Sequence, residues 1–270
     1  ALFVPPVAPT DDRRTFAGLM NVTRILRAPG GCPWDREQTH ASLKIHLIEE
    51  VYEVVEALDE ADDVKLREEL GDLLFQIAIH AQIAAEMDEF DIGDILGGIC
   101  GKLIRRHPHV FGDLDLPTAQ SVLRRWESFK QSEKPDRDSI LSGIPTSMPA
   151  LPYSYAIQRR AANQGFEWHD VLGVLRKVRE ELDELESEIT HEGGQARILD
   201  ELGDVFFALV SLGRWLKSDP EEALRFANRK FVGRFRQVEA LCREEGKSLS
   251  QLSDEEVDRL WQRAKEEPAA

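Results

Sequence analysis

Cysteine is scarce in this 270-residue sequence, and its few cysteines form no motif. Cys32, Cys100 and Cys242 are far apart, and no two of them make a CxxC pair. This spacing argues against a disulfide framework and against a thiolate zinc site. We therefore expect a protein of the reducing cytoplasm. The first residues, "ALFVPPVAPT", agree with this expectation because they lack the basic and apolar regions of a signal peptide.

Long apolar runs and an excess of basic residues are absent as well. No apolar run approaches the roughly 18 residues that span a bilayer, so we expect no membrane partner. The chain carries 34 Lys and Arg against 50 Asp and Glu, a net charge of −16. Such a surface repels the phosphates of a nucleic-acid polymer. A small anionic ligand is still compatible with it, because a divalent cation and a few basic side chains reverse the field locally.

Strand patterns are nearly absent, and helical periods fill the chain instead. They predict helices at about 16–28, 42–60, 66–86, 91–106 and 117–131, and again at 151–163, 171–189, 196–216, 221–245 and 254–265. A stretch rich in Pro, Ser and charge separates the two groups and is typical of a linker. We predict an all-α protein built from two tandem homologous helical-bundle domains. The predicted parts are a loose N-terminal arm at 1–12, domains at 13–131 and 151–270, and a linker at 132–150.

The two halves repeat the same acidic motif. "LREELGDLLF" begins at Leu66 and "ILDELGDVFF" begins at Ile198. The alignment that matches them also matches "WESFK" near the end of the first half with "WQRAK" near the end of the second. It pairs four carboxylates of each half: Glu50, Glu53, Glu69 and Asp72 with Glu181, Glu184, Glu201 and Asp204.

This spacing predicts a metal site in each half. Residues three apart share one face of a helix, so two such helices packed side by side bring four carboxylates together. Like charges at that distance are unfavourable unless a cation lies among them, and oxygen-only ligands suit Mg²⁺ or Mn²⁺. The alternative for any single motif is a solvated acidic face. However, the residues after each ELGD are apolar nearly all round, so we expect these helices to be largely buried, with Gly71 and Gly203 permitting close approach of a neighbour.

The sequence resembles the all-α nucleoside triphosphate pyrophosphohydrolases of the MazG type over nearly its full length. The resemblance rests on "GGCPWDREQTHASLKIHLIEEVYEV" and "RRHPHVFGD" in the first half, and on "EELDE", "DELGD", "ANRKFVGRFRQVE" and "WQRAK" in the second. It implies a tandem all-α fold, a homodimer, and Mg²⁺-dependent hydrolysis of NTPs and dNTPs to the monophosphate and pyrophosphate, with Mn²⁺ as a substitute metal. It further implies a role in nucleotide-pool housekeeping or in stress.

The roles of individual residues follow from the resemblance and from the needs of phosphoryl transfer, which depends on charge neutralisation and an activated water. Glu181, Glu184, Glu201 and Asp204 would hold Mg²⁺, and Glu180 is a candidate for orienting or deprotonating water. Lys177 lies one turn before Glu181 and could reach a phosphate oxygen, or it could form an ordinary Lys–Glu pair. The predicted substrate-binding residues are Lys177, Asn228, Lys230, Arg234, Trp261 and Lys265. The alternative for Lys230 and Arg234 is a solvated basic stripe, and the alternative for Trp261 is a purely packing role.

The first half keeps the acids but not every cation. His46 stands where the second half has Lys177, and Cys100 stands where it has Asn228, while Lys102 and Arg106 match Lys230 and Arg234. We therefore expect the C-terminal half to be the main active site, and the N-terminal site to bind metal and substrate or to be structural. A further open choice concerns the "CPWDREQTH" loop, whose candidate residues either contact a base or cap a helix: Trp34, Asp35, Gln38 and His40.

Two other classes remain open at this stage. A di-iron carboxylate bundle expects an ExxH motif on two helices, and Glu37 with His40 has that spacing but not in the right place. A non-enzymatic helical dimerisation or interaction protein would use the acids only for solvation. The sequence leaves open the preferred base and sugar, whether damaged nucleotides or alarmones are substrates, which phosphorus is attacked, and the general base.

Overall fold

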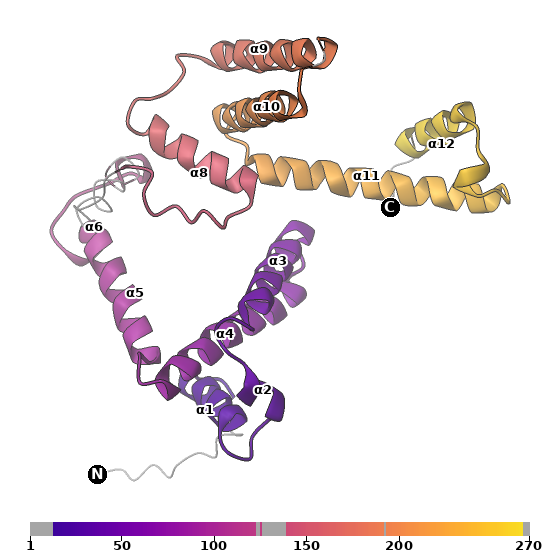
Figure 1. Cartoon of the computed structure of the whole chain (residues 1–270). Coiled ribbons are helices and arrows are strands. Elements are labelled where there is room, and N and C mark those ends of the chain that lie inside the picture. The colour runs from indigo at the N-terminus through magenta and orange to yellow at the C-terminus, as the bar shows by residue number, and fades with distance from the viewer. Residues whose placement is uncertain (1–12, 123–124, 126–138, 192, 267–270) are drawn as a thin grey trace, which may run out of the picture. The chain divides into compact units, whose positions relative to one another are not determined.

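The computed structural model describes residues 13–122, 125, 139–191 and 193–266 (Figure 1). Every regular element in these residues is a helix, which confirms the predicted all-α class. Contacts divide the chain into two compact units, Ala1–Pro135 and Asp136–Ala270. The predicted N-terminal arm at 1–12 and "WESFK" at 126–130 lie outside the described residues, as do large parts of the predicted linker and of the helix at 117–131.

Unit 1 is built around an antiparallel helix pair. Its helices are α1 (Phe16–Arg27), α2 (Pro33–Glu37), α3 (Lys44–Glu60), α4 (Asp63–Glu86), α5 (Ile92–Arg106) and α6 (Pro108–Phe111). Helix α3 packs along α4, and α4 also contacts α1 and α5. Leu43, Ile79 and Ile83 form the buried cluster of this unit, with Phe75 packed against it.

A tight turn sets the antiparallel pairing of α3 and α4. Ala61 closes α3 in the left-handed region, with φ of 53°. Asp62 then caps α4, because its side chain accepts hydrogen bonds from the backbone N–H groups of Val64 and Lys65. Because the connection between α3 and α4 is so short, the acidic segments of the two helices lie side by side.

Unit 2 has a matching helix pair. Its helices are α8 (Ala150–Ala162), α9 (Val171–Thr190), α10 (Gln195–Trp215), α11 (Pro220–Glu244) and α12 (Asp254–Glu266), with a 3₁₀ turn at Leu249–Gln251. Helix α9 packs along α10, α8 contacts α10 and α11, and α12 folds back on α11 (Figure 1). At the contact between α11 and α12, five residues pack together and are buried: Val238, Leu241, Cys242, Leu260 and Ala264.

The long helices lie close to their predicted positions, but two short ones were missed. Pro108 follows the end of α5 at Arg106 and opens α6, because proline suits the first position of a helix. Pro33 opens α2 in the same way, where the sequence suggested a loop. Among the described residues, no helix combines the length and hydropathy that a membrane crossing requires.

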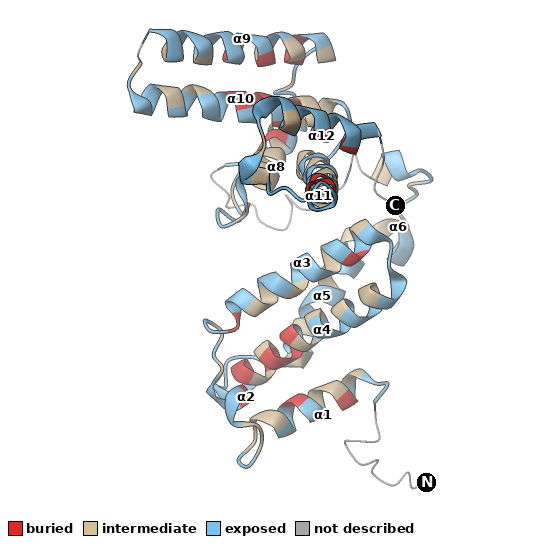
Figure 2. Cartoon of the chain, turned by 90° about the vertical axis from the view of Figure 1, so that its right-hand side faces the viewer, coloured by how far each residue is buried: buried red, intermediate tan, exposed pale blue. Residues whose placement is uncertain are grey.

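Two expectations about packing were wrong or only partly met. Among the described residues, a Cβ added at Gly71 or Gly203 would meet no atom within 4 Å, so neither glycine serves a close approach to a described neighbour in its own unit. The helices that follow the ELGD motifs are buried on one side only. Ile79 of α4 and Val210 of α10 are buried, whereas Leu74 and Phe206 on the same helices are exposed, and Figure 2 shows the exposed stretches along both pairs.

Candidate active site

The C-terminal acidic cluster consists of Glu181 on α9 and of Glu201 and Asp204 on α10. Each residue offers a carboxylate oxygen, and these oxygens lie within 4.8 Å of one another. Glu181 is buried, while Glu201 is half-buried and Asp204 is exposed. Three oxygen donors at this separation fit a hard divalent cation such as Mg²⁺ or Mn²⁺.

The N-terminal acidic cluster consists of Glu50 on α3 and of Glu69 and Asp72 on α4. Its carboxylate oxygens also lie within 4.8 Å of one another. The structure thus brings together three of the four carboxylates predicted for each half. The fourth, Glu53 or Glu184, lies one helical turn after Glu50 or Glu181, close enough for the two carboxylates to affect each other's acidity.

Crowding of the carboxylates changes their acidity. Burial, followed by the charge of Asp204, raises the pKa of Glu201. Burial, followed by the hydrogen bond and charge of Glu181, raises the pKa of Glu184. In unit 1, burial and then Asp72 raise the pKa of Glu50. These directions mean that each cluster resists carrying its full negative charge, which is the condition that a bound cation relieves.

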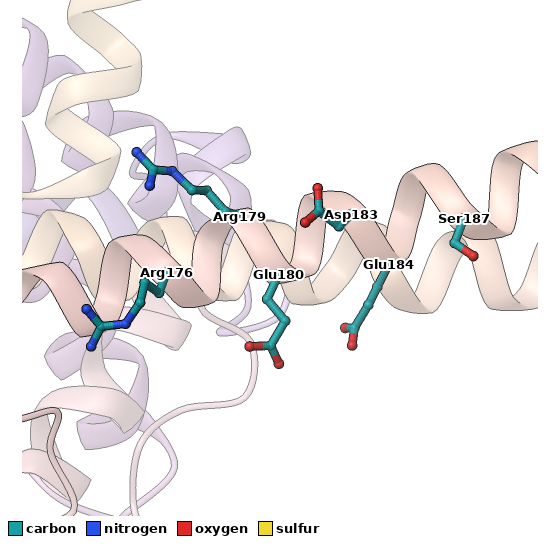
Figure 3. Close-up of a pocket in the computed structure, with 6 residues that line it drawn as sticks. All are labelled: Arg176, Arg179, Glu180, Asp183, Glu184 and Ser187. Carbon is teal, nitrogen blue, oxygen red and sulfur yellow. The ribbon is translucent and has the colours of Figure 1, made fainter.

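The ammonium group of Lys177 contacts the C-terminal acidic cluster. Its Nζ donates to Glu180 Oε1 at 2.6 Å and lies 2.7 Å from Glu181 Oε1. Glu180 itself is exposed and is not a member of the cluster. Figure 3 shows Arg176, Glu180 and Glu184 projecting from one side of α9, in a shallow pocket that they share with Arg179, Asp183 and Ser187.

A second cavity, which we call the aromatic pocket, opens beside the C-terminal acidic cluster. Its volume is about 530 Å³. Lys177, Glu181 and Asp204 line one part of it. The remaining wall is mainly apolar and comes from Leu141 before α8, from α8, the α8–α9 loop, α9 and α10, with Phe166, Trp168, Phe207 and Ala208 among its residues. Carboxylates and a cation therefore meet an aromatic surface in one cavity.

The α8–α9 loop is fixed to α10 by an ion pair. The Glu167 carboxylate accepts two hydrogen bonds from the Arg214 guanidinium, one of them at 2.8 Å, and a third from Trp215 Nε1 at 2.9 Å. The backbone N–H of Trp168 donates to the same carboxylate at 2.9 Å. The hydrogen bonds from Arg214 are the main reason why the pKa of Glu167 is lowered. This set of contacts holds Phe166 and Trp168 at the pocket.

The remaining predicted substrate residues lie on α11 and α12. Lys230 Nζ lies 5.7 Å from the ring centroid of Phe226, and Lys265 Nζ donates to Gln262 Oε1 at 3.3 Å. The Trp261 ring packs on Phe231, with 5.5 Å between centroids. The described side chains that line the aromatic pocket include none from α11 or α12, so Asn228, Lys230, Arg234, Trp261 and Lys265 do not join the acids within this cavity.

The corresponding region of unit 1 has different partners. His46 Nδ1 lies 2.9 Å from Glu49 Oε2, and its ring meets Trp34 edge-on at 6.0 Å between centroids. Asp35 is buried, and Gln38 Nε2 donates to the backbone carbonyl of Trp34 at 3.0 Å.

His40 contacts a second histidine, His80. Its Nδ1 lies 2.7 Å from Nδ1 of His80, so the ExxH spacing of Glu37 and His40 does not add His40 to the N-terminal acidic cluster.

The sequence reasoning missed the aromatic pocket and the Glu167–Arg214 pair. The available signal was "GFEW" at 165–168, which places two aromatic residues around an acid between two predicted helices. Arg214, a cation at the end of an apolar helix, was the other signal. Neither pattern is specific by itself, because the pairing needs the packing of α8 against α10.

Comparison with known proteins gives consistent matches. The model of the MazG nucleotide pyrophosphohydrolase domain matches residues 38–111, within unit 1. The "Nucleoside triphosphate pyrophosphohydrolase/pyrophosphatase MazG" of Thermotoga maritima is 46% identical over 252 residues, which cover 93% of this chain and 95% of that protein. The nucleoside triphosphate pyrophosphohydrolase of Escherichia coli K12 is 43% identical over 251 residues, 92% of this chain and 95% of the relative. Both similarities extend across the two units.

Proposed function

The chain belongs to the MazG nucleotide pyrophosphohydrolase family, and we propose that it is a Mg²⁺-dependent enzyme that hydrolyses NTPs and dNTPs to the nucleoside monophosphate and pyrophosphate. One observation carries the proposal beyond family membership. The carboxylates of Glu181, Glu201 and Asp204 converge within 4.8 Å, and Glu181 and Asp204 line the aromatic pocket together with Lys177. Such a cavity can hold a divalent cation and an organic group at the same time.

The C-terminal acidic cluster is the proposed metal site of the main active site. Glu181, Glu201 and Asp204 would hold Mg²⁺, with Glu184 beside them as the fourth carboxylate and Mn²⁺ as a substitute metal. A metal held there would neutralise phosphate charge and lower the pKa of water. Glu180 is the proposed residue for orienting or deprotonating that water, because it lies next to Glu181 and shares the Lys177 ammonium.

The proposed substrate-binding cations act on the phosphates. Lys177 already faces the C-terminal acidic cluster and would donate to a phosphate oxygen in place of one carboxylate contact. Asn228, Lys230, Arg234, Trp261 and Lys265 lie outside the aromatic pocket, and their proposed role is to contact the outer phosphates and the nucleotide surface that the pocket leaves uncovered.

We propose the two units as homologous MazG-like domains, at 13–131 and 151–270, joined by a linker at 132–150. In each unit a helix pair carries an acidic cluster, which supports the repeat. The N-terminal acidic cluster, with Glu53 beside it, would bind metal but turn over little substrate. A homodimer is proposed because Leu74, Phe206 and other apolar side chains of the acidic helices are exposed in the single chain. The proposed setting is cytoplasmic, in nucleotide-pool housekeeping or stress.

Product analysis with and without metal tests this function. Each common NTP is incubated with the protein in Mg²⁺ or in excess chelator, and phosphorus NMR identifies the products. The expected result is equal release of monophosphate and pyrophosphate in Mg²⁺ only. Orthophosphate as the sole inorganic product would overturn the pyrophosphohydrolase assignment. Absence of any cleavage would favour the helical interaction protein, and cleavage restored by iron alone would favour the di-iron class.

A further inference from the structure

The aromatic pocket is polar at one end and aromatic at the other, and a single face of α10 connects the two ends. Asp204 belongs to the C-terminal acidic cluster, whereas Arg214, ten residues further along α10, holds the α8–α9 loop. Ten helical residues span roughly 15 Å. Phe207, Ala208 and Ser211 line the pocket between these two residues.

We propose that the loop Gly165–Trp168 receives the nucleoside of the substrate, and that Glu167 and Arg214 are positioning residues that hold this loop over the pocket. This inference rests on the proposed function, because the acidic cluster at the other end must take the phosphates. The pocket volume of about 530 Å³ falls within the range of roughly 300–1,000 Å³ that is usual for small-molecule sites.

Phe166 and Trp168 have different parts in this arrangement. Trp168 packs against the start of α9, where a Cβ added at Gly173 would lie 3.5 Å from Trp168 Cε3. Phe166 is 85% exposed although its residue lines the pocket. Trp168 therefore forms a fixed wall, and Phe166 presents a free aromatic face. An exposed phenylalanine at the mouth of an apolar cavity is suited to stacking on a nucleobase.

The Glu167–Arg214 contact fixes the loop between these two rings. Glu167 receives hydrogen bonds from Arg214, from Trp215 and from the backbone N–H of Trp168. Gly165 begins the loop with φ of 88°, in the left-handed region where a glycine is favoured. Loss of the Arg214 contacts would leave the Trp215 hydrogen bond as the remaining side-chain contact from α10 to Glu167, and would loosen the loop while leaving the acidic cluster in place.

The aromatic loop offers ring faces to the base. Gln158 donates its Nε2 to the backbone carbonyl of Phe207 at 2.8 Å, and its buried Oε1 has no hydrogen-bond partner among the described residues. Stacking accepts every base because each base has a π-face. We therefore expect the loop to bind purine and pyrimidine nucleotides alike, and the larger purines more tightly.

Kinetics of the full-length protein test this inference, with ATP and CTP as substrates and pyrophosphate as an inhibitor that carries no nucleoside. For Phe166→Ala the KM for ATP should rise about tenfold, because loss of one base–aromatic stack has roughly this effect. The rise in KM should exceed any change in kcat, and the inhibition constant of pyrophosphate should stay within about twofold. Arg214→Met should act in the same direction, and Arg214→Lys should recover part of the loss because it keeps one charged contact.

The control is Phe90→Ala, which removes an exposed phenylalanine ring from the α4–α5 loop of unit 1, outside the aromatic pocket, and should leave KM unchanged. Two results would overturn the inference: an unchanged KM in Phe166→Ala, or a pyrophosphate inhibition constant that rises in parallel with KM. Since Phe166 is exposed, its truncation should not unfold the chain, and thermal melting checks this. Failure of the wild-type protein to release pyrophosphate would overturn the proposed function as well. Normal wild-type turnover, with an unchanged KM in the Phe166 and Arg214 variants, would overturn this inference alone.

Discussion

Lys177 Nζ lies 2.7 Å from Oε1 of Glu181, the buried carboxylate of the C-terminal acidic cluster. Hydrogen bonds to Glu180 and then to Glu181 raise the pKa of Lys177, so the side chain stays an ammonium throughout the physiological range. In unit 1 the aligned residue is His46, which contacts Glu49 instead. The two acidic clusters are therefore alike in their carboxylates and different in the cation beside them.

The first prediction concerns this cation. Lys177→Met should lower kcat/KM for ATP by about two orders of magnitude, because a positioned charge at the developing phosphate charge contributes on the order of 2–4 kcal/mol. Lys177→Arg should retain more activity than Lys177→Met, since it keeps the charge. Steady-state rates at saturating Mg²⁺ measure both variants. Equal activity of Lys177→Met and wild type would show that the residue is only a surface partner of Glu180.

The second prediction concerns the metal ligands. Glu201→Gln or Asp204→Asn should abolish NTP cleavage while helix content, measured by circular dichroism, stays nearly unchanged. Each substitution removes an anionic oxygen that Mg²⁺ needs but leaves no cavity, because neither residue is fully buried. Loss of the helical signal on substitution would indicate a structural role for the acidic cluster.

The third prediction uses the lowered pKa of Glu167. A carboxyl group whose pKa is lowered in the folded state stabilises the fold above its ordinary pKa of 4.5 and loses that contribution as the pH falls through the lower folded value. Glu167→Gln should therefore be less stable than wild type at about pH 7, and the difference should shrink steadily below about pH 4.5. Urea unfolding of both proteins at several pH values measures it. A difference that is constant with pH would contradict the charged contact with Arg214.

The acidic clusters could be predicted from the sequence because their geometry is local. Helical spacing predicts Glu181 on the face of α9 that meets α10, and the ELGD repeat supplies Glu201 and Asp204 on α10, whereas Glu184 lies beside the cluster and not in it. The short turn at Ala61 and Asp62 shows how such helices become antiparallel neighbours in unit 1. Periodicity and turn chemistry determine this much without knowledge of the tertiary fold.

The aromatic pocket could not be predicted in the same way. Its walls come from α8, α9, α10 and the loop between α8 and α9, so Gln158, Phe166 and Phe207 meet only through tertiary packing. The same limit explains the wrong expectation for Gly203. A mid-helix glycine permits close approach, but its position in the sequence does not show whether a neighbour fills the space.

The last prediction is that the two acidic clusters are unequal in catalysis. The double variant Glu69→Gln with Asp72→Asn should retain most NTP hydrolysis, whereas Glu201→Gln with Asp204→Asn should remove it. Both clusters have carboxylate oxygens within 4.8 Å, so metal binding alone does not distinguish them.

The cation and the cavity make the difference. Lys177 faces the C-terminal acidic cluster and lines the aromatic pocket beside Glu181, and the matching position in unit 1 is occupied by His46. Neutralising the triphosphate in the transition state is the main electrostatic contribution that a site of this kind offers, and the Lys177 ammonium can contribute to it. Steady-state rates of the two matched double variants, which carry the same chemical changes, test the assignment directly. Equal losses would show that both clusters are needed, and a larger loss from the N-terminal pair would place the chemistry in unit 1, where the family model also matches; either result would contradict the assignment.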